Sequence, residues 1–315
     1  MTKPIITVTL NPAIDETITL DDLHPGQVHR ARSVRFNAGG KGVNVASCLA
    51  DWGLPVIATG VLGDANDSVF KTLFAAKRIT DRFSRTTGDT RVNIKLVHNA
   101  DTTDINLPGL RLTPDKLSEL TDTVLGLAGS DSLVVLGGSV PAGLSDGLYR
   151  ELIAALATRG ARVLLDTSGA PLTAALGDQA RHLPDCVKPN RAELEAWIGH
   201  PLPDMASVAV AARALVARGI PLVVVSLGEK GALFATDAQV LLATSPVVAC
   251  ASTVGAGDAM VAGIVAALHE KAPLEDIARL ATAFAVGKLG LPGPNLPSRA
   301  EIEARAAKVH IAILT

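Results

Sequence analysis

The chain has 315 residues, 48% of them hydrophobic, and a formal net charge of −2 at pH 7. This length and apolar content suffice for one large α/β domain or two small ones. Acidic and basic residues are mixed along the chain rather than gathered into runs, which argues against a nucleic-acid footprint and a polybasic membrane patch.

The cysteines and the apolar stretches predict a cytoplasmic protein. Cys48, Cys186 and Cys250 are far apart and form no Cys-x-x-Cys pair, as expected in a reducing compartment. The N-terminus enters a strand-like run without the apolar core of a secretory signal. The longest apolar stretch, Ala259–Leu268, is shorter than the ~20 residues that cross a bilayer. We interpret it as a buried helix.

Alternating strand-like and helix-like segments predict an α/β fold. Aliphatic runs that end in small or polar residues are typical of buried parallel strands, and they occur at Ile5–Leu10, Leu133–Leu136, Val163–Leu165 and Leu222–Val225. Helix-like segments include Lys116–Leu127, Gly147–Ala157, Ala192–Ile198 and Val208–Val216. We expect a mostly parallel central sheet covered by helices on both faces.

Two stretches, residues 13–36 and 88–108, break this pattern. They alternate polar with apolar residues, as a half-exposed antiparallel sheet does. A period of two puts Arg91, Asn93 and Lys95 on one face of the second stretch. We predict that the two insertions form a small β-sheet lid on a single domain spanning residues 1–315.

Polar and glycine-rich residues follow the predicted strands. In parallel sheets, ligands bind beyond the carboxyl ends of the strands. The residues expected there are Asn11, Gly138-Ser139, Asp166, Lys188-Pro189-Asn190 and Ser226-Leu227-Gly228. This set suits a crevice that handles phosphate.

The first glycine-rich motif runs from Asn37 to Asn44. Its glycines permit close approach of the backbone to a ligand, while Lys41 and Asn44 add a charge and an amide. Glycine pairs before helices are also plain turns. The motif is not a Walker A loop, because Gly42 rather than Ser or Thr follows Lys41. The first strand is also followed by no Gly-x-Gly-x-x-Gly turn, which counts against a nicotinamide-dependent oxidoreductase.

Two later motifs have both a structural and a functional interpretation. Asn190 and Glu193 have the spacing of a helix capping box, and they could also organise magnesium and its waters. The Ser226–Gly231 loop follows a strand-like run. It is either a plain hairpin turn or a loop that wraps a nucleotide phosphate with backbone N–H groups.

The sharpest signal is the motif from Ser252 to Asp258, directly before the apolar run. Gly255 and Gly257 allow a tight turn that aims successive N–H groups at one point, and a helix start adds its positive dipole end. Asp258 there is either a helix N-cap or the base of a phosphoryl-transfer site.

Together, Ala38-Gly39-Gly40-Lys41-Gly42-Val43-Asn44 and Ser252-Thr253-Val254-Gly255-Ala256-Gly257-Asp258 resemble the two signatures of the ribokinase superfamily. The stretches Thr9–Asp15, Thr90–Lys95, Gly138–Pro141 and Lys188–Asn190 are similar to its phosphofructokinase-B branch, and most of all to the 1-phosphofructokinases. The resemblance covers essentially the whole chain. It implies a three-layer α/β/α ribokinase-like fold with a β lid.

The resemblance also implies roles for individual residues. Asp258 is the expected base, and the N–H groups of Gly255, Ala256 and Gly257 hold the migrating phosphoryl group. The expected sugar-binding residues are Asp15, Gly39, Gly40, Lys41 and Asn44. The substrate phosphate is assigned to Arg91, Asn93 and Lys95, with Ser139 beside it. The nucleotide side comprises Lys188, Asn190, Ser226, Gly228, Lys230 and Gly231, with Glu193 contacting magnesium through water.

The implied reaction transfers the γ-phosphoryl group of ATP to the 6-hydroxyl of fructose 1-phosphate. ATP and Mg²⁺ are the implied cofactors, and the resemblance allows K⁺ near Ser252 and Val254. The expected partners are a sugar phosphate and a second copy of the chain bound through the lid, with no nucleic acid or membrane. Alternatives are a kinase of fructose 6-phosphate or tagatose 6-phosphate, and a non-catalytic sugar-phosphate sensor.

Overall fold

A computed structural model describes residues 4–99, 101–246 and 254–314. Its main sheet is built around β1 (Ile5–Thr9), all of whose residues are buried, as predicted for this aliphatic run. The other strands of this sheet are β4 (Val56–Gly63), β5 (Thr80–Asp81), β6 (Ser84–Thr86), β9 (Leu133–Gly137), β10 (Arg162–Asp166), β11 (Cys186–Val187), β12 (Leu222–Ser226), β13 (Ala232–Ala235), β14 (Val240–Thr244) and β15 (His310–Leu314).

The strand order in the described chain is β15-β14-β13-β12-β11-β10-β9-β1-β4-β5, and β6 also pairs with β4. Within this order, neighbouring strands are parallel from β12 through β1 to β5. The strands β13, β14 and β15 are added in antiparallel pairing at the other end of the sheet. The expectation of a mostly parallel sheet is confirmed. All the parallel strands therefore end at one edge, where the polar residues were expected to gather.

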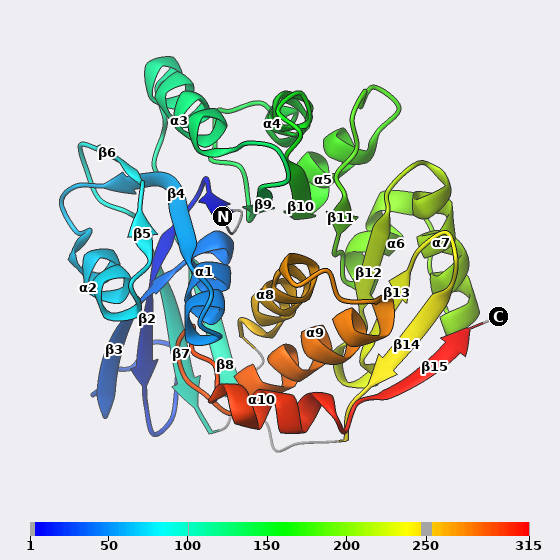
Figure 1. The fold of residues 1–315 in the computed structure, drawn as a ribbon. Helices are drawn as coiled ribbons and strands as arrows, with labels where there is room; N and C mark the ends of the chain where they lie inside the picture. The colour runs from blue at the N-terminus through cyan, green and yellow to red at the C-terminus, as the bar shows by residue number, and fades with distance from the viewer. Residues whose placement is uncertain (1–3, 100, 247–253, 315) are drawn as a thin grey trace.

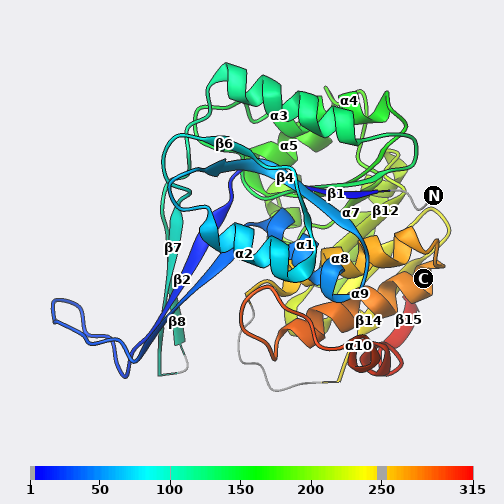
Figure 2. The same ribbon diagram turned by 60° about the vertical axis from the view of Figure 1, so that its left-hand side comes forward.

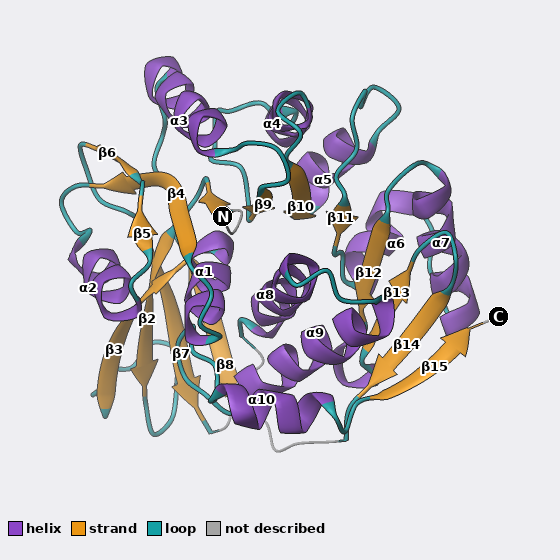
Figure 3. Cartoon of the chain, viewed as in Figure 1, coloured by secondary structure: helices purple, strands orange, loops and turns teal. Residues whose placement is uncertain are grey.

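Helices cover both faces of the sheet (Figures 1 and 3). One buried cluster packs beneath α1 (Lys41–Asp51), α2 (Ser68–Lys77), α8 (Ala256–His269), α9 (Leu274–Lys288) and α10 (Arg299–Ala306). A second lies beneath α3 (Pro114–Leu127), α4 (Leu148–Ala157), α5 (Gly169–Leu176), α6 (Arg191–Ile198) and α7 (Met205–Ala217). The three layers are thus confirmed, and α8 is the predicted buried helix. No helix among the described residues is long and apolar enough to span a membrane.

A separate four-stranded sheet projects from this body (Figure 2). Its order is β3 (Ser33–Gly39), β2 (Ala13–Thr19), β7 (Val92–His98) and β8 (Asp101–Asn106). Its strands come from the two stretches that break the α/β pattern. However, β2 and β7 pair in parallel, which corrects the expectation of an antiparallel sheet. The reason is that both strands leave the main body from the same edge, after the carboxyl ends of β1 and of the parallel strands β4 and β6.

Candidate active site

The site is centred on the first turn of α8. Gly255 is the N-cap, and its φ of 79° is a left-handed conformation that favours glycine. The amides of Ala256, Gly257 and Asp258 belong to the first turn, where no intrahelical acceptor exists. These N–H groups and the helix dipole suit this turn to bind an anion, and it is called the anion site below. Ser252 and Thr253, from the same motif, lie outside the described residues.

Asp258 is a buried carboxylate, 8% exposed, in this first turn. The N-cap interpretation of Asp258 is wrong, because Gly255 occupies that position. Its Oδ2 instead accepts a hydrogen bond of 2.7 Å from Nδ2 of Asn44 on α1. Burial, with a contribution from the nearby Asp166 carboxylate, raises the pKa of Asp258 to about 6. A carboxylate with that pKa is ionised near pH 7 and binds a proton more readily than an ordinary aspartate.

The glycine motif that begins α1 brings Asn44 into place. A Cβ on Gly40, whose φ is 109°, would lie 2.7 Å from Cγ2 of Thr9, and one on Gly42 would lie 2.5 Å from Oγ1 of Thr9. The motif therefore packs directly against β1. A Cβ on Gly39 would lie 2.9 Å from Oδ2 of Asp15, so this glycine leaves room for a predicted sugar-binding side chain.

Two lysines share one buried carboxylate between the sugar motif and the anion site. Oδ1 of Asp166 lies 3.1 Å from Nζ of Lys41 and 3.3 Å from Nζ of Lys188. Burial would raise the pKa of Asp166, but Lys188 and Lys41 outweigh that effect and hold the pKa below its usual value. Nζ of Lys188 would lie 3.6 Å from a Cβ on Gly257, so this ammonium borders the anion site.

Asp166 is a residue whose role the sequence did not predict. It was expected only among the polar residues that end the buried strands, and it ends β10. The available signal was a charged residue directly after the aliphatic residues of a strand. Its two lysine partners could not be found from spacing, because they lie 125 and 22 residues away.

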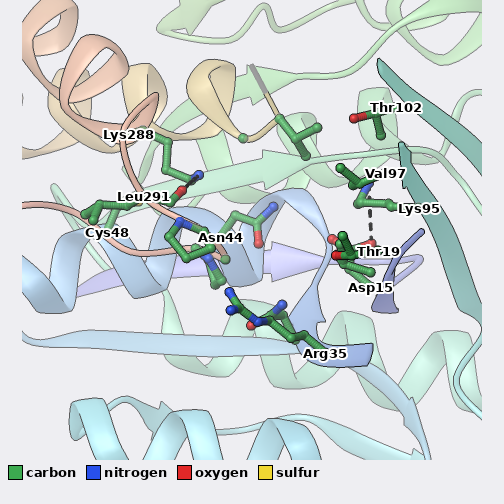
Figure 4. A pocket seen from close by; sticks show the side chains of 17 residues that line it. Asp15, Thr19, Arg35, Asn44, Cys48, Lys95, Val97, Thr102, Lys288 and Leu291 are labelled. Atoms are coloured by element: carbon green, nitrogen blue, oxygen red, sulfur yellow. Dashed lines mark hydrogen bonds and ion pairs between the residues drawn. The ribbon is translucent and has the colours of Figure 1, made fainter. Parts of the chain in front are cut away.

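Part of the predicted sugar side, Asp15, Asn44 and Lys95, lines one pocket (Figure 4). Gly39, Gly40, Lys41 and Asn93 are not among the described residues that line it. Asp15 lies opposite Asn93 in the parallel register of β2 and β7, and Nδ2 of Asn93 lies 3.3 Å from Oδ1 of Asp15. Nζ of Lys95 is 3.9 Å from the same oxygen. The pocket is lined by Asp15, Lys95, Asn44 and Gly255, among others. The structure thus brings these predicted residues next to the first turn of α8.

Arg91 and Ser139 lie at a neighbouring corner. The Arg91 guanidinium donates to the carbonyls of Asn11 and Leu107, each at 3.2 Å. Nδ2 of Asn11 in turn donates to Oγ of Ser139 at 2.9 Å. Neither Arg91 nor Ser139 is among the described residues that line the pocket of Figure 4. They are near each other as predicted, but beside that pocket rather than in it.

The predicted nucleotide side surrounds a second pocket, of about 440 Å³. It is lined by Ser226, Gly228, Gly231, Ala256 and Gly257, together with the apolar residues Met260, Ala285, Val286 and Leu289. Lys230 and Asn190 line an adjoining pocket that shares Ser226 and Gly228 with it. The Ser226–Gly231 loop is also a turn between the antiparallel strands β12 and β13, with a short 3₁₀ segment at Gly228–Lys230. The structural and functional interpretations of this loop are therefore compatible.

The capping box of α6 is confirmed. The Asn190 side chain accepts from the Glu193 amide, and the Glu193 carboxylate accepts from the Asn190 amide, each at 2.8 Å. Asn190 lines a pocket together with Ser226 and Gly228, so the capped helix start faces the crevice. Burial lowers the pKa of Lys41, but Asp166, Asp258 and, to a smaller extent, Glu193 outweigh that effect and raise it. Within residues 4–99, 101–246 and 254–314, no three His, Cys, Asp or Glu side chains form a metal-binding cluster. A magnesium ion here would depend on phosphate and water oxygens, as is usual for this ion with nucleotides.

Comparisons with known proteins agree with this geometry. The model of a family described as pfkB family carbohydrate kinase matches residues 8–300. The 1-phosphofructokinase of Xanthomonas campestris pv. campestris is 57% identical over 292 residues, 92% of each chain. That of Rhodobacter capsulatus is 44% identical over 317 residues, covering 100% of this chain and 99% of the relative.

A solved structure shows the same fold. The crystal structure of phosphofructokinase-2 from Escherichia coli in complex with fructose-6-phosphate superposes with a TM-score of 0.89 at 30% identity, covering 97% of this chain and 98% of that one. The resemblance to the phosphofructokinase-B branch of the ribokinase superfamily is confirmed. The chain belongs to the pfkB family of carbohydrate kinases.

Proposed function

We propose that the protein transfers the γ-phosphoryl group of ATP to the 6-hydroxyl of fructose 1-phosphate, giving fructose 1,6-bisphosphate and ADP. The observation that carries this proposal is the buried Asp258, hydrogen-bonded to Asn44 where the sugar pocket meets the anion site. Relatives that cover nearly the whole chain and are called 1-phosphofructokinase support this choice of substrate.

Asp258 is proposed as the base. Its carboxylate accepts the proton of the 6-hydroxyl while the sugar oxygen attacks the γ-phosphorus and the bond to the ADP oxygen breaks. The amides of Gly255, Ala256 and Gly257 stabilise the charge that develops on the migrating group. Lys41 and Lys188, held by Asp166, add positive charge at the same place.

Both ends of the acceptor must be accommodated, because fructose 1-phosphate is already an anion. We propose that Arg91, Asn93 and Lys95 hold its phosphate beside Ser139, and that Asp15, Gly39, Gly40, Lys41 and Asn44 hold the sugar. Arg91 uses three of its donors on backbone carbonyls in the structure, which leaves the remaining N–H groups of its guanidinium for a phosphate.

ATP is proposed to lie across the second pocket, with its phosphates toward Gly257 and Lys188. The apolar side chains of Met260, Val286 and Leu289 suit an aromatic base. Mg²⁺ would neutralise the β- and γ-phosphates, with Glu193 reaching it through water. The resemblance also allows K⁺ near Ser252 and Val254, of which Ser252 lies outside the described residues. Replacing KCl with NaCl tests that possibility, and unchanged turnover would remove it.

The small sheet is proposed as a lid within one kinase domain and as a dimer interface. Val34, Phe36 and Ile105 are 45%, 57% and 44% exposed. The register aligns Phe36, Glu16, Ile94 and Ile105 on the face opposite to Asp15. An exposed apolar sheet face of this kind suits a second copy of the chain. Molar mass in solution tests this: a monomer for the wild type would contradict it.

The proposed activity is tested by measuring ADP release with Mg²⁺ and ATP on fructose 1-phosphate, fructose 6-phosphate, tagatose 6-phosphate and unphosphorylated fructose. We expect kcat/KM to be highest for fructose 1-phosphate. Preference for a 6-phosphate would keep the mechanism but change the substrate. Fructose 6-phosphate is the second candidate, because the similar phosphofructokinase-2 of Escherichia coli was solved in complex with fructose-6-phosphate. If none of these sugars is phosphorylated, the result would favour the alternative of a non-catalytic sugar-phosphate sensor.

The raised pKa of Asp258 predicts the pH dependence of turnover. The base acts when ionised, so kcat/KM should be level above pH 7 and fall about tenfold per pH unit below about 6. Phosphate groups of the substrates titrate in the same range. The residual turnover of Asp258→Asn therefore supplies the control profile. A wild-type profile that parallels this control would contradict the assignment.

Removal of Arg91 should weaken only the sugar side. We expect Arg91→Ala to raise KM for fructose 1-phosphate by roughly 10- to 100-fold, the value of a charge-assisted hydrogen bond, with little change in KM for ATP. The exposed Arg82 provides a matched control, since Arg82→Ala should change neither constant. A larger effect on ATP would place Arg91 at the nucleotide instead.

A further inference from the structure

Lys77, the last residue of α2, joins three segments that are far apart in the sequence. Its side chain is 14% exposed, and its ammonium lies within hydrogen-bond distance of more acceptors than it has protons. Two of the acceptors belong to α1 and two to the loop that follows α9. They are Oγ of Ser47 at 2.7 Å, Oδ2 of Asp51 at 2.7 Å, the Pro294 carbonyl at 3.2 Å and Oδ1 of Asn295 at 2.8 Å.

The partners of Lys77 also contact one another. Oγ of Ser47 donates to the Pro294 carbonyl, and Oδ2 of Asp51 accepts from the amide of Leu296 at 2.9 Å. Lys77 contacts both of these α1 side chains and the loop, so it is the centre of the network. Because Asp51 is only 21% exposed, loss of the ammonium would leave a largely buried carboxylate without this counter-charge.

The loop held by Lys77 forms one wall of the pocket of Figure 4. All of residues 291–294 line this pocket, and Leu291 lies on the opposite side from Asp15 in that view. Lys77 itself is not among the described residues that line it. The lysine can therefore affect a bound sugar only through the loop and α1.

This wall also meets the small sheet. Gly293 has a left-handed φ of 64°, and a Cβ there would lie 2.9 Å from Oδ1 of Asn37 on β3. Asn37 lies opposite Asp15 in the register of β2 and β3. Because the contact is so close, a shift of the loop would disturb the strand that lies beside a proposed sugar-binding residue.

We propose that Lys77 is a positioning residue for the sugar pocket, whose ammonium clamps the loop of residues 291–294 to α1. This inference rests on the proposed function, in which that pocket holds the sugar phosphate. None of residues 291–294 is among the described residues that line the nucleotide pocket. Loss of the clamp should therefore weaken the binding of the sugar phosphate and spare the binding of ATP.

The test compares the two Michaelis constants in Lys77→Met, which keeps most of the apolar part of the side chain and removes the ammonium. We expect KM for fructose 1-phosphate to rise by roughly 10- to 100-fold, in the range that a misplacement of about 1 Å costs, with KM for ATP changed by less than about threefold. A loss of stability alone predicts no such difference between the substrates. An equal rise in both constants, or no rise in either, would overturn the inference.

Arg85 supplies the matched control, because it holds the other end of the same helix. Its side chain is 26% exposed, and its guanidinium lies 3.2 Å from Oδ2 of Asp67, the N-cap of α2, and 2.6 Å from Oδ2 of Asp81. We expect Arg85→Met to lower the melting temperature, as Lys77→Met does, without separating the two Michaelis constants. The same separation in both variants would indicate a general effect of α2 and would contradict a specific role of Lys77.

A second variant tests the loop end of the clamp. Asn295→Ala removes one acceptor and leaves the ion pair of Lys77 with Asp51 in place. We expect KM for fructose 1-phosphate to rise by a smaller factor than in Lys77→Met. The double variant should be no worse than Lys77→Met alone, because both changes break the same interaction. Fully additive effects would count against the clamp.

Hydrogen exchange separates this inference from the proposed activity. Without substrate, the amides between residues 291 and 296 should exchange faster in Lys77→Met than in the wild type, and at the wild-type rate in Arg85→Met. That result would support the inference even if no sugar phosphate is turned over, an outcome that would overturn only the proposed activity. Wild-type exchange of this segment in Lys77→Met would show that the lysine does not hold the loop.

Discussion

The hydrogen bond between Asn44 and Asp258 is the interaction on which the site depends. It joins the first turns of α1 and α8, which lie 214 residues apart in the sequence. Because Asp258 is buried, its charged form requires such a partner. Asn44 in turn is the last residue of the glycine motif that packs against β1. This one bond therefore fixes the glycine motif relative to the first turn of α8, and it holds Asp258, the proposed base, between them.

Two buried carboxylates close to this bond have opposite pKa shifts. Burial raises the pKa of Asp258, whereas two lysines reverse the effect of burial on Asp166. The second stays ionised and holds Lys41 and Lys188, while the first can exchange a proton near neutral pH. Environments that move the pKa values of neighbouring acids apart allow one to be structural and the other catalytic. The structural role of Asp166 and the proposed catalytic role of Asp258 thus follow from charge and burial rather than from residue type.

The sequence was sufficient for features that depend on local pattern. Aliphatic runs predicted the buried strands, and the Gly255–Asp258 motif predicted a tight turn at a helix start. Features that depend on long-range contact were missed. The parallel pairing of β2 with β7 follows from where both strands leave the main sheet, and the role of Asp166 follows from lysines supplied by other elements. Spacing along the chain carries no record of these contacts.

The most direct test of the account is the rate of phosphoryl transfer in a single turnover by Asp258→Asn, measured together with the affinity for fructose 1-phosphate. If Asp258 is the base, the rate should fall by roughly 10²- to 10⁴-fold, the usual value of general base catalysis, while the dissociation constant changes little because the amide preserves the shape of the site. A rate close to that of the wild type would contradict the assignment of the base and, with it, the organisation of the site around Asp258.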